Sequence, residues 1–248
     1  MKLHDPRART RRAFFFAIFA AVASLAASWP QSTLAADSGK PKIGLIGSGR
    51  IGGTLGELWA KAGYPVMFSS LDVAHDKELA ARVGAGARAG TPAEAAAFGD
   101  VLLISVPYSA LPQIGRDYAA SIKGKVVLDT SNPIAGRDGD IAVPAREKGT
   151  GVASAEYLAG ARLVRAFNSV GYTYLRSEAH RAGEKVAIPL AADDPEALKV
   201  ATRLVEDAGF EPVFVGPLAK AKEFDVGTPV FGKALTASEL RKTLGIAK

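Results

Sequence analysis

Residues Lys42 to Gly53, with the sequence KIGLIGSGRIGG, decide the fold of this 248-residue chain. A short apolar run breaks into glycines, and an apolar periodicity through Leu55 and Trp59 follows. This pattern predicts a strand, a tight turn and a helix over residues 50–62. A second strand is predicted at Val66 to Ser69. The stretch therefore opens a βαβ unit.

The turn carries the G-x-G-x-x-G spacing in Gly47, Gly49 and Gly52. In a dinucleotide site the first glycine allows the turn, the second lets the backbone approach a pyrophosphate, and the third lets the helix pack on the strand. The pyrophosphate then faces the N–H groups at the helix start. Because the motif here follows a strand and opens a helix, it predicts a dinucleotide site, with a purely structural turn as the alternative.

Residues 1–36 have the pattern of a cleaved export signal. Basic residues precede an uncharged run from Phe14 to Ala27, which is too short to span a bilayer. Cleavage is expected after Ala35 or Ala36. The pair Arg11-Arg12 resembles a twin-arginine signal, which predicts a folded protein passed by the twin-arginine translocase to the periplasm, or otherwise exported. A general secretory signal with incidental arginines is the alternative.

Charge and composition exclude several classes of function. The net charge of +6 falls to +2 without residues 1–36, and no basic stripe interleaved with aromatic residues remains, so nucleic acid is not expected as a partner. The chain has no cysteine, which excludes disulfides and thiolate sites. Only two histidines, His75 and His180, follow the signal, so no metal site is expected.

Residues 37–248 alternate strand-like and helix-like segments without a linker. We expect one α/β domain, a doubly wound, mostly parallel Rossmann-type sheet with a C-terminal extension from about residue 217. Residues 134–150 are expected as a long surface connection that could lie over the site. The other predicted strands are Val101 to Val106, Val126 to Asp129, Leu163 to Phe167, Val186 to Leu190 and Pro212 to Val215, and the other predicted helices are Asp76 to Val83, one starting at Thr91-Pro92, Leu111 to Ala120, Pro195 to Ala208 and Ala237 to Leu244.

Ligands of such sheets lie beyond the carboxyl ends of the strands. The side chains there are polar but nearly uncharged, without paired carboxylates or a Ser-His-Asp set, so hydrolysis is disfavoured. Hydride transfer fits best, because the cofactor carries that chemistry. No catalytic residue is singled out, and each residue could instead be structural. The candidate pocket consists of Ser48, Gly49, Arg50, Ile51, Ser69, Ser70, Val106, Pro107, Tyr108, Ser131, Asn132, Pro133, Asn168 and Ser169.

Four segments together resemble the NADPH-dependent F-420 (8-hydroxy-5-deazaflavin) reductase family: IGLIGSGRIGG from Ile43, VVLDTSNP from Val126, LVRAFNSVG from Leu163 and PLAADDPEA from Pro189. The resemblance spans residues 42–216. It implies hydride transfer between NADP on the glycine loop and a deazaflavin at the strand ends. The resemblance places Gly47, Ser48, Gly49, Arg50, Ile51 and Gly52 at the pyrophosphate, Ser69 and Ser70 at the 2′-phosphate, and Pro107, Asn132 and Asn168 around the nicotinamide and the acceptor.

One departure from the family affects the cofactor. The family usually has an arginine after the serine that ends the second strand, and here Leu71 follows Ser70. Leucine cannot replace a guanidinium that pairs with a phosphate. We expect NADP to be held instead by Arg50 with the two serine hydroxyls. NAD stays open, and Asp72 is the residue that could favour it.

Two alternatives to a deazaflavin reductase remain. An exported dinucleotide-binding protein without turnover could serve as a sensor or a partner subunit. A reductase of an imine, a flavin or a ferric acceptor would use the same fold. In each case the partner is a small molecule, and a homodimer is possible.

Overall fold

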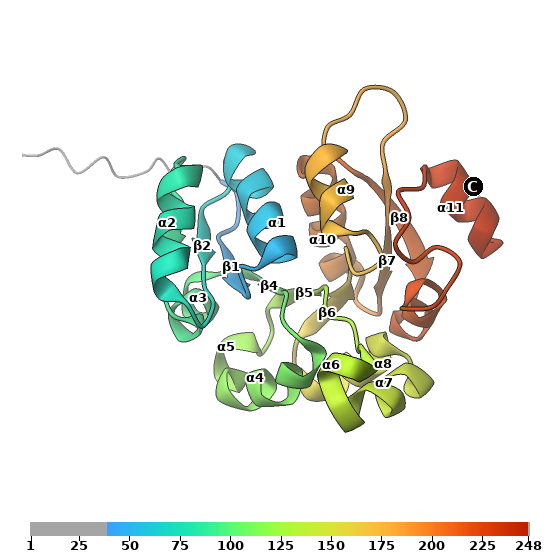
Figure 1. The fold of residues 1–248 in the computed structure, drawn as a ribbon, viewed down its shortest axis with the longest axis horizontal. Helices are drawn as coiled ribbons and strands as arrows, with labels where there is room; N and C mark the ends of the chain where they lie inside the picture. The colour runs from blue at the N-terminus through green and yellow to red at the C-terminus, as the bar shows by residue number, and fades with distance from the viewer. Residues whose placement is uncertain (1–38, 248) are drawn as a thin grey trace, which may run out of the picture. The chain divides into compact units, whose positions relative to one another are not determined.

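The computed structural model describes residues 39–247, in which eight strands form one sheet in the order β3-β2-β1-β4-β5-β6-β7-β8 (Figure 1). Neighbouring strands are parallel except β6 and β7. The strand order reverses between β1 and β4, where ligands of doubly wound sheets bind. The predicted fold class is confirmed. The strands are β1 (Ile43–Ile46), β2 (Val66–Phe68), β3 (Arg88–Ala89), β4 (Val101–Ile104), β5 (Val126–Asp129), β6 (Arg162–Arg165), β7 (Ala187–Ala192) and β8 (Glu211–Gly216).

Helices cover both faces of the sheet. The α-helices are α1 (Arg50–Lys61), α2 (Val73–Val83), α3 (Pro92–Phe98), α4 (Leu111–Asp117), α5 (Ala119–Ile122), α6 (Ala135–Asp138), α7 (Ala142–Lys148), α8 (Thr150–Tyr157), α9 (Tyr172–Ser177), α10 (Pro195–Asp207) and α11 (Ala237–Leu244). Short 3-10 helices are η1 (Tyr108–Ala110), η2 (Gly139–Ile141) and η3 (Leu218–Phe224).

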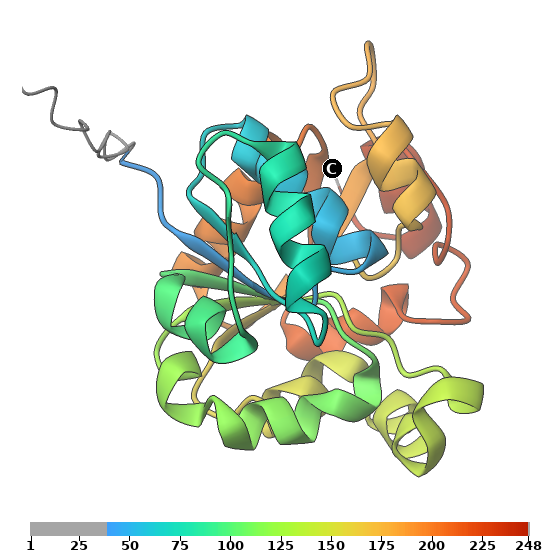
Figure 2. The same ribbon diagram turned by 60° about the vertical axis from the view of Figure 1, so that its left-hand side comes forward.

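The core lies in two layers because successive strand residues point to opposite faces. Leu103 of β4 packs in the layer with α1, α2 and α10, whereas its neighbours Leu102 and Ile104 pack in the layer with α4 and α8. Both views place α1 and α2 (blue to teal) and α4 and α5 (green) on opposite sides of the sheet (Figures 1 and 2). A third cluster joins the outer face of β7 and β8 to η3 and α11.

Two expectations about local structure are wrong. Residues 134–150 contain α6, η2 and α7 rather than a surface connection without structure, and α8 follows directly. Glycines with positive φ, Gly139 at 62° and Gly149 at 92°, separate these helices, so each is too short to show a clear periodicity. The segment predicted as a single helix from Leu111 to Ala120 is divided at Tyr118 into α4 and α5.

The predicted export signal, residues 1–36, lies outside the described residues. None of the helices within residues 39–247 has the length and apolarity needed to cross a membrane.

Candidate functional site

The turn after β1 requires glycine at two positions. Gly47 has a φ of +99°, and its N–H donates to the carbonyl of Ser69 at 2.9 Å, which joins the ends of β1 and β2. A Cβ on Gly47 would lie 2.2 Å from the carbonyl oxygen of Ser105, and a Cβ on Gly52 would lie 1.9 Å from that of Gly47. The close approach of β1, β4 and α1 therefore depends on both glycines.

Gly49 differs from these two glycines because the space beside it is open. A Cβ on Gly49 would meet no atom within 4 Å. Gly49 is the N-cap residue of α1, no side chain caps this helix, and its first turn has no acidic residue. The first N–H groups of α1 and the positive end of its dipole are thus open to an anion. These residues fit the pyrophosphate of the dinucleotide expected from the sequence.

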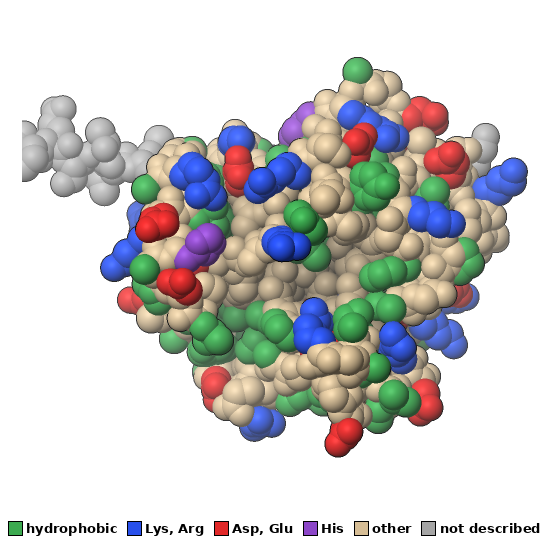
Figure 3. All heavy atoms as spheres, viewed as in Figure 1, with side chains coloured by type: hydrophobic (Ala, Val, Ile, Leu, Met, Phe, Trp, Pro, Cys, Tyr) green, Lys and Arg blue, Asp and Glu red, His purple; other side chains and the backbone are tan. Residues whose placement is uncertain are grey.

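A cavity of about 300 Å³ opens between the start of α1 and the carboxyl ends of β4 and β5. Figure 3 shows a hollow in this face, with basic side chains at its edge. Seven residues of the predicted pocket line the cavity: Gly49, Arg50, Ile51, Val106, Pro107, Ser131 and Asn132. The other lining residues are Ser105, Thr130 and Arg137. The strand ends named from the sequence therefore do meet at one cavity.

Arg137 reaches this cavity from α6, in the segment predicted as a surface connection. Its Nη2 donates to the carbonyl of Asn132 at 2.7 Å and forms an ion pair with Asp138 at 2.8 Å. Burial raises the pKa of Asp138, but hydrogen bonds from Arg137 and from the N–H groups of Ile134 and Ser109 outweigh it and hold that pKa below its ordinary value. Arg137 is thus fixed as a cation at the cavity edge.

Arg50 does not lie where the predicted 2′-phosphate contact requires it. Its guanidinium stacks on Tyr172 of α9, with Cζ 5.0 Å from the ring centroid, and Nη1 is 3.4 Å from the Tyr172 hydroxyl. In Figure 1, α9 and β2 lie on opposite sides of α1, and the 2′-phosphate would lie at the end of β2. Arg50 therefore points to the cavity and α9 in this structure, away from the end of β2, and its pairing with a 2′-phosphate stays a prediction.

The serine hydroxyls expected at the 2′-phosphate already donate to other groups. Ser69 is buried, and its hydroxyl donates to the carbonyl of Leu45 at 2.5 Å. Ser48 and Ser70 both donate to the carboxylate of Asp76 in the first turn of α2. The prediction that Ser69 and Ser70 donate to a 2′-phosphate therefore has no support in this structure.

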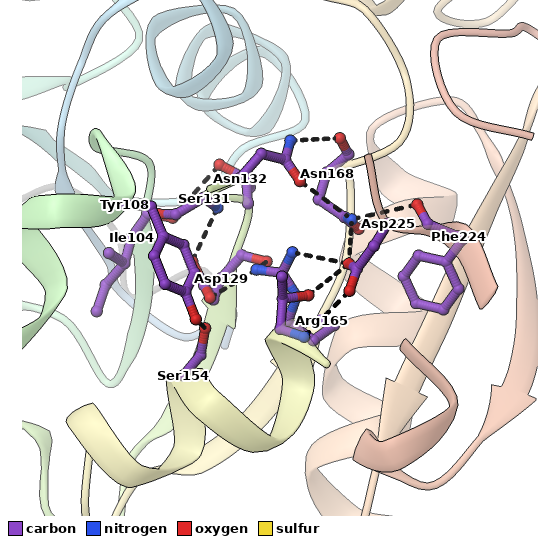
Figure 4. Close-up of polar contacts among 12 residues, drawn as sticks. Ile104, Tyr108, Asp129, Ser131, Asn132, Ser154, Arg165, Asn168, Phe224 and Asp225 are labelled. Carbon is purple, nitrogen blue, oxygen red and sulfur yellow. Dashed lines mark hydrogen bonds and ion pairs between the residues drawn. The ribbon is translucent and has the colours of Figure 1, made fainter. Parts of the chain in front are cut away.

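Below the cavity, Arg165 lies completely buried between two carboxylates (Figure 4). Its Nη1 donates to Asp129 at 2.6 Å, and its Nη2 lies 3.6 Å from Asp225. Burial opposes the charge on Arg165, but Asp129 and Asp225 outweigh it and hold the pKa above its ordinary value. Asp225, which follows η3 in the C-terminal extension, also accepts from Thr150.

Asn132 and Asn168 hold each other in place above this ion cluster (Figure 4). The Nδ2 of Asn132 donates to the carbonyl of Asn168 at 2.7 Å, and the Nδ2 of Asn168 lies 3.4 Å from Asp225. Two buried oxygens here, Asn168 Oδ1 and Ser131 Oγ, have no hydrogen-bond partner within the described residues. Buried polar atoms normally have one. Ser131 lines the cavity, whereas Asn168 is not among the lining residues.

Tyr108 and Pro133 lie away from the cavity, so their predicted contact with substrate is corrected. Tyr108 is completely buried in the layer with α4 and α8, where its hydroxyl accepts from Ser154 at 3.2 Å. Burial raises the pKa of Tyr108. Pro133 is buried as well, and its carbonyl accepts from Arg146. Both residues support the site from behind.

The sequence interpretation missed Asp76, Arg137 and Arg165. Arg165 had a visible signal, since a cation inside an apolar strand of a buried sheet needs a carboxylate partner. Asp76 and Arg137 stand in polar segments, where charged residues are common, so no signal distinguished them.

Residues 42–133 match the model of the family described as NADP oxidoreductase, coenzyme F420-dependent. No curated protein sequence matches the chain. A hypothetical protein, SMa0349 of Sinorhizobium meliloti, is 25% identical with a TM-score of 0.70, over 80% of this chain and 96% of that one. A proposed F420-dependent NADP reductase of Arthrobacter sp. FB24 is 18% identical with a TM-score of 0.64, over 79% and 99% of the two chains.

An imine reductase of Myxococcus stipitatus in complex with NADP+ is 18% identical with a TM-score of 0.55, over 73% of this chain and 57% of that one. At this identity the likeness shows a shared fold. The family resemblance found in the sequence is thus confirmed for residues 42–133, which match the model of the F420-dependent NADP oxidoreductases within a Rossmann-type fold.

Proposed function

We propose that this protein is an oxidoreductase that transfers hydride between a nicotinamide dinucleotide and a small acceptor, with a deazaflavin of the F-420 type as the first acceptor to test. One observation carries the proposal. The uncapped start of α1, with open space at Gly49, faces a cavity at the carboxyl ends of β4 and β5. A pyrophosphate at α1 and a nicotinamide in the cavity would use both features.

When bound, the dinucleotide would supply the hydride chemistry, and the residues of this chain would bind and orient it. The N–H groups of Ile51 and Gly52 would hold the pyrophosphate. Val106 and Pro107 form an apolar part of the cavity lining, against which the nicotinamide ring would pack. Ser131 lines the cavity, and its Oγ, which has no partner among the described residues, would hydrogen-bond the carboxamide or the acceptor.

The acceptor is a proposal that rests on two similarities. The family description names coenzyme F420, and the proposed reductase of Arthrobacter carries the same name. The imine reductase of Myxococcus makes a cyclic imine the second acceptor to test. Flavin and ferric acceptors complete the panel, because hydride transfer itself does not distinguish acceptors on a shared fold.

The test is anaerobic oxidation of NADH and NADPH by the purified protein, followed by the loss of absorbance of the reduced nicotinamide. We expect turnover with at least one acceptor of the panel. Ser131→Ala should lower the rate, because it removes a hydroxyl at the cavity. Ser121→Ala, at a half-buried position of α5 outside the cavity lining, is the matched control. Binding of nucleotide without turnover on any acceptor would contradict a reductase and favour the alternative of a binding protein.

We also propose export through the twin-arginine translocase. The proposal rests on the Arg11-Arg12 pair and the uncharged run that follows it. Replacing both arginines by lysine should leave precursor in the cytoplasm, which cell fractionation measures. Normal export of the double variant would indicate a general secretory signal instead.

A further inference from the structure

We propose that Asp76 determines the dinucleotide preference, so that this protein binds NAD(H) more tightly than NADP(H). The inference rests on the proposed function and names a residue outside the glycine loop. Asp76 lies in the first turn of α2, and its carboxylate is completely buried. It accepts from Ser48 of the glycine loop through Oδ1 and from Ser70 after β2 through Oδ2, the latter at 2.8 Å.

The position of this cluster places it at the adenosine ribose. In Rossmann folds the group at the end of the second strand reads the ribose: an acidic residue binds the 2′-hydroxyl of NAD, and an arginine binds the 2′-phosphate of NADP. Here Ser69 and Ser70 follow β2, and Gly47 donates to the carbonyl of Ser69, so the end of β2 lies against the glycine loop. Asp76 connects these two segments, because it accepts from Ser48 of the glycine loop and from Ser70 after β2.

The hydroxyl protons of Ser48, Ser69 and Ser70 are already donated to other groups of the protein. A serine hydroxyl has one proton to donate and lone pairs that accept. Ser70 donates to Asp76, since a carboxylate is a stronger acceptor than the carbonyl of Asp72 at 3.2 Å, and it accepts from the N–H of Asp72 at 3.1 Å. Ser48 donates to Asp76 and Ser69 to the carbonyl of Leu45. These hydroxyls therefore present lone pairs to a ligand.

A lone pair suits the 2′-hydroxyl of NAD and opposes the 2′-phosphate of NADP. The 2′-hydroxyl has a proton to donate, whereas a phosphate at neutral pH carries a charge of about −1.5 to −2 and only acceptor oxygens. Turning the hydroxyls of Ser48 and Ser70 towards a phosphate would leave Asp76 buried without donors, next to a second anion. Whether the hydroxyls present lone pairs or turn towards the phosphate, the binding of NADP is weakened.

Two positions that could carry a compensating charge do not supply it at the end of β2. Leu71 stands fully exposed at the position where the related reductases usually have an arginine. Arg50 is held on Tyr172, on the other side of α1. Neither position therefore supplies a basic group to a 2′-phosphate: Leu71 is uncharged, and Arg50 is turned away.

The test is isothermal titration of the purified protein with NAD+ and NADP+. We expect wild type to bind NAD+ at least about tenfold more tightly, the effect of one unfavourable charge contact. Asp76→Asn, which keeps the shape and removes the charge, should strengthen NADP+ binding about tenfold and change NAD+ binding little. Glu78→Gln is the matched control, because Glu78 is an exposed carboxylate on the same helix, outside the Asp76 cluster; it should leave the ratio unchanged.

The wild-type measurement decides the proposal even if Asp76→Asn fails to fold, as judged by circular dichroism. Tighter binding of NADP+ than of NAD+ by wild type overturns the role of Asp76, and so does an equal effect of Asp76→Asn on both nucleotides. In those outcomes the dinucleotide site itself stands. Failure of wild type to bind either nucleotide overturns the proposed function and this inference together.

Discussion

Two of the parallel βαβ units, β1-α1-β2 and β7-α10-β8, start their long helices differently. At α10, the side chain of Asp194 accepts from the N–H groups of Glu196 and Ala197, at 2.8 and 3.1 Å. Arg162 pairs with the same carboxylate at 2.6 Å. At α1, the N-cap residue is Gly49, and no side chain accepts from the first turn. The first N–H groups of α10 are therefore capped by a side chain, whereas those of α1 are not.

The difference shows that the function of a βαβ unit depends on the residue at its turn. Both helices offer free N–H groups and the positive end of a dipole. A carboxylate at α10 uses these groups for stability, whereas glycine at α1 leaves them for an anionic ligand. An acidic N-cap placed at α1 should therefore stabilise the helix and weaken dinucleotide binding, and loss of the acidic N-cap at α10 should lower stability.

The largest effect is expected from Gly49→Asp, which would give α1 the start that α10 has. The φ of Gly49 is −65° with an extended ψ, the conformation of an N-cap residue, and there is open space for the side chain. The new carboxylate should cap α1 and repel a pyrophosphate, so dinucleotide binding should weaken by more than about a hundredfold, or about 2.7 kcal/mol. Isothermal titration measures the loss.

Gly49→Val and Gly49→Ser serve as controls for this variant. Valine should also block the pyrophosphate, by its bulk, while circular dichroism shows an unchanged fold. Serine caps the helix without a charge and should weaken binding less than aspartate does. If all three variants bind both nucleotides as wild type does, the start of α1 is not the binding site.

The next largest effect is expected from Gly52→Ala, which tests the packing of the same loop. A Cβ at Gly52 would lie 1.9 Å from the carbonyl oxygen of Gly47, which is backbone and cannot move aside. Overpacking of this kind costs about 1–3 kcal/mol or more. Urea denaturation should show a lower midpoint than for Gly49→Ala, whose Cβ meets nothing. Equal midpoints for the two variants would contradict the close packing described here.

A smaller effect is expected from Asp194→Ala, which opens the start of α10. Loss of an N-cap should lower the melting temperature by about 2–4 °C. Dinucleotide binding should not change, since α10 lies outside the cavity. Asp194→Asn restores the cap without the charge and should recover most of the loss. A change in nucleotide affinity would mean that the two helix starts are coupled.

The smallest effect is the pH dependence of that loss. Hydrogen bonds from Arg162 and from the N–H groups of Ala197 and Glu196 hold the pKa of Asp194 below its ordinary value. A carboxyl group with a lowered pKa in the folded state stabilises the fold above its unfolded pKa, about 3.9, and loses that contribution as the pH falls further. The difference in melting temperature between wild type and Asp194→Ala should therefore shrink below about pH 4.

The sequence predicted the central strands well because β1, β4 and β5 are buried on both faces. β5 and α11 have the predicted bounds, Val126 to Asp129 and Ala237 to Leu244. The helices between Ala135 and Tyr157 were missed, because glycines divide them into pieces of eight residues or fewer. Periodicity needs more than two turns to be visible.

The sequence predicted where in the fold the site lies, but it predicted less well which way the side chains of the site point. Residues that end strands meet at one edge of a sheet, so Gly49, Val106 and Asn132 could be placed together. Where a side chain turns depends on partners far along the chain. Arg50 lies on Tyr172, and Tyr108 turns towards Ser154, and neither partner could be read from its neighbours in sequence.

The contact of Asp225 with Arg165 can form only late in the synthesis of the domain, because the two residues lie far apart in the sequence. A chain is synthesised from its N-terminal end, and domains generally fold as units. β1 to β6 are synthesised before residue 225, and until then Arg165 has only one of its two carboxylates, Asp129. The buried ion cluster therefore needs a residue that is made well after the glycine loop, and a nascent chain that stops short of Asp225 would have the loop but an incompletely paired Arg165.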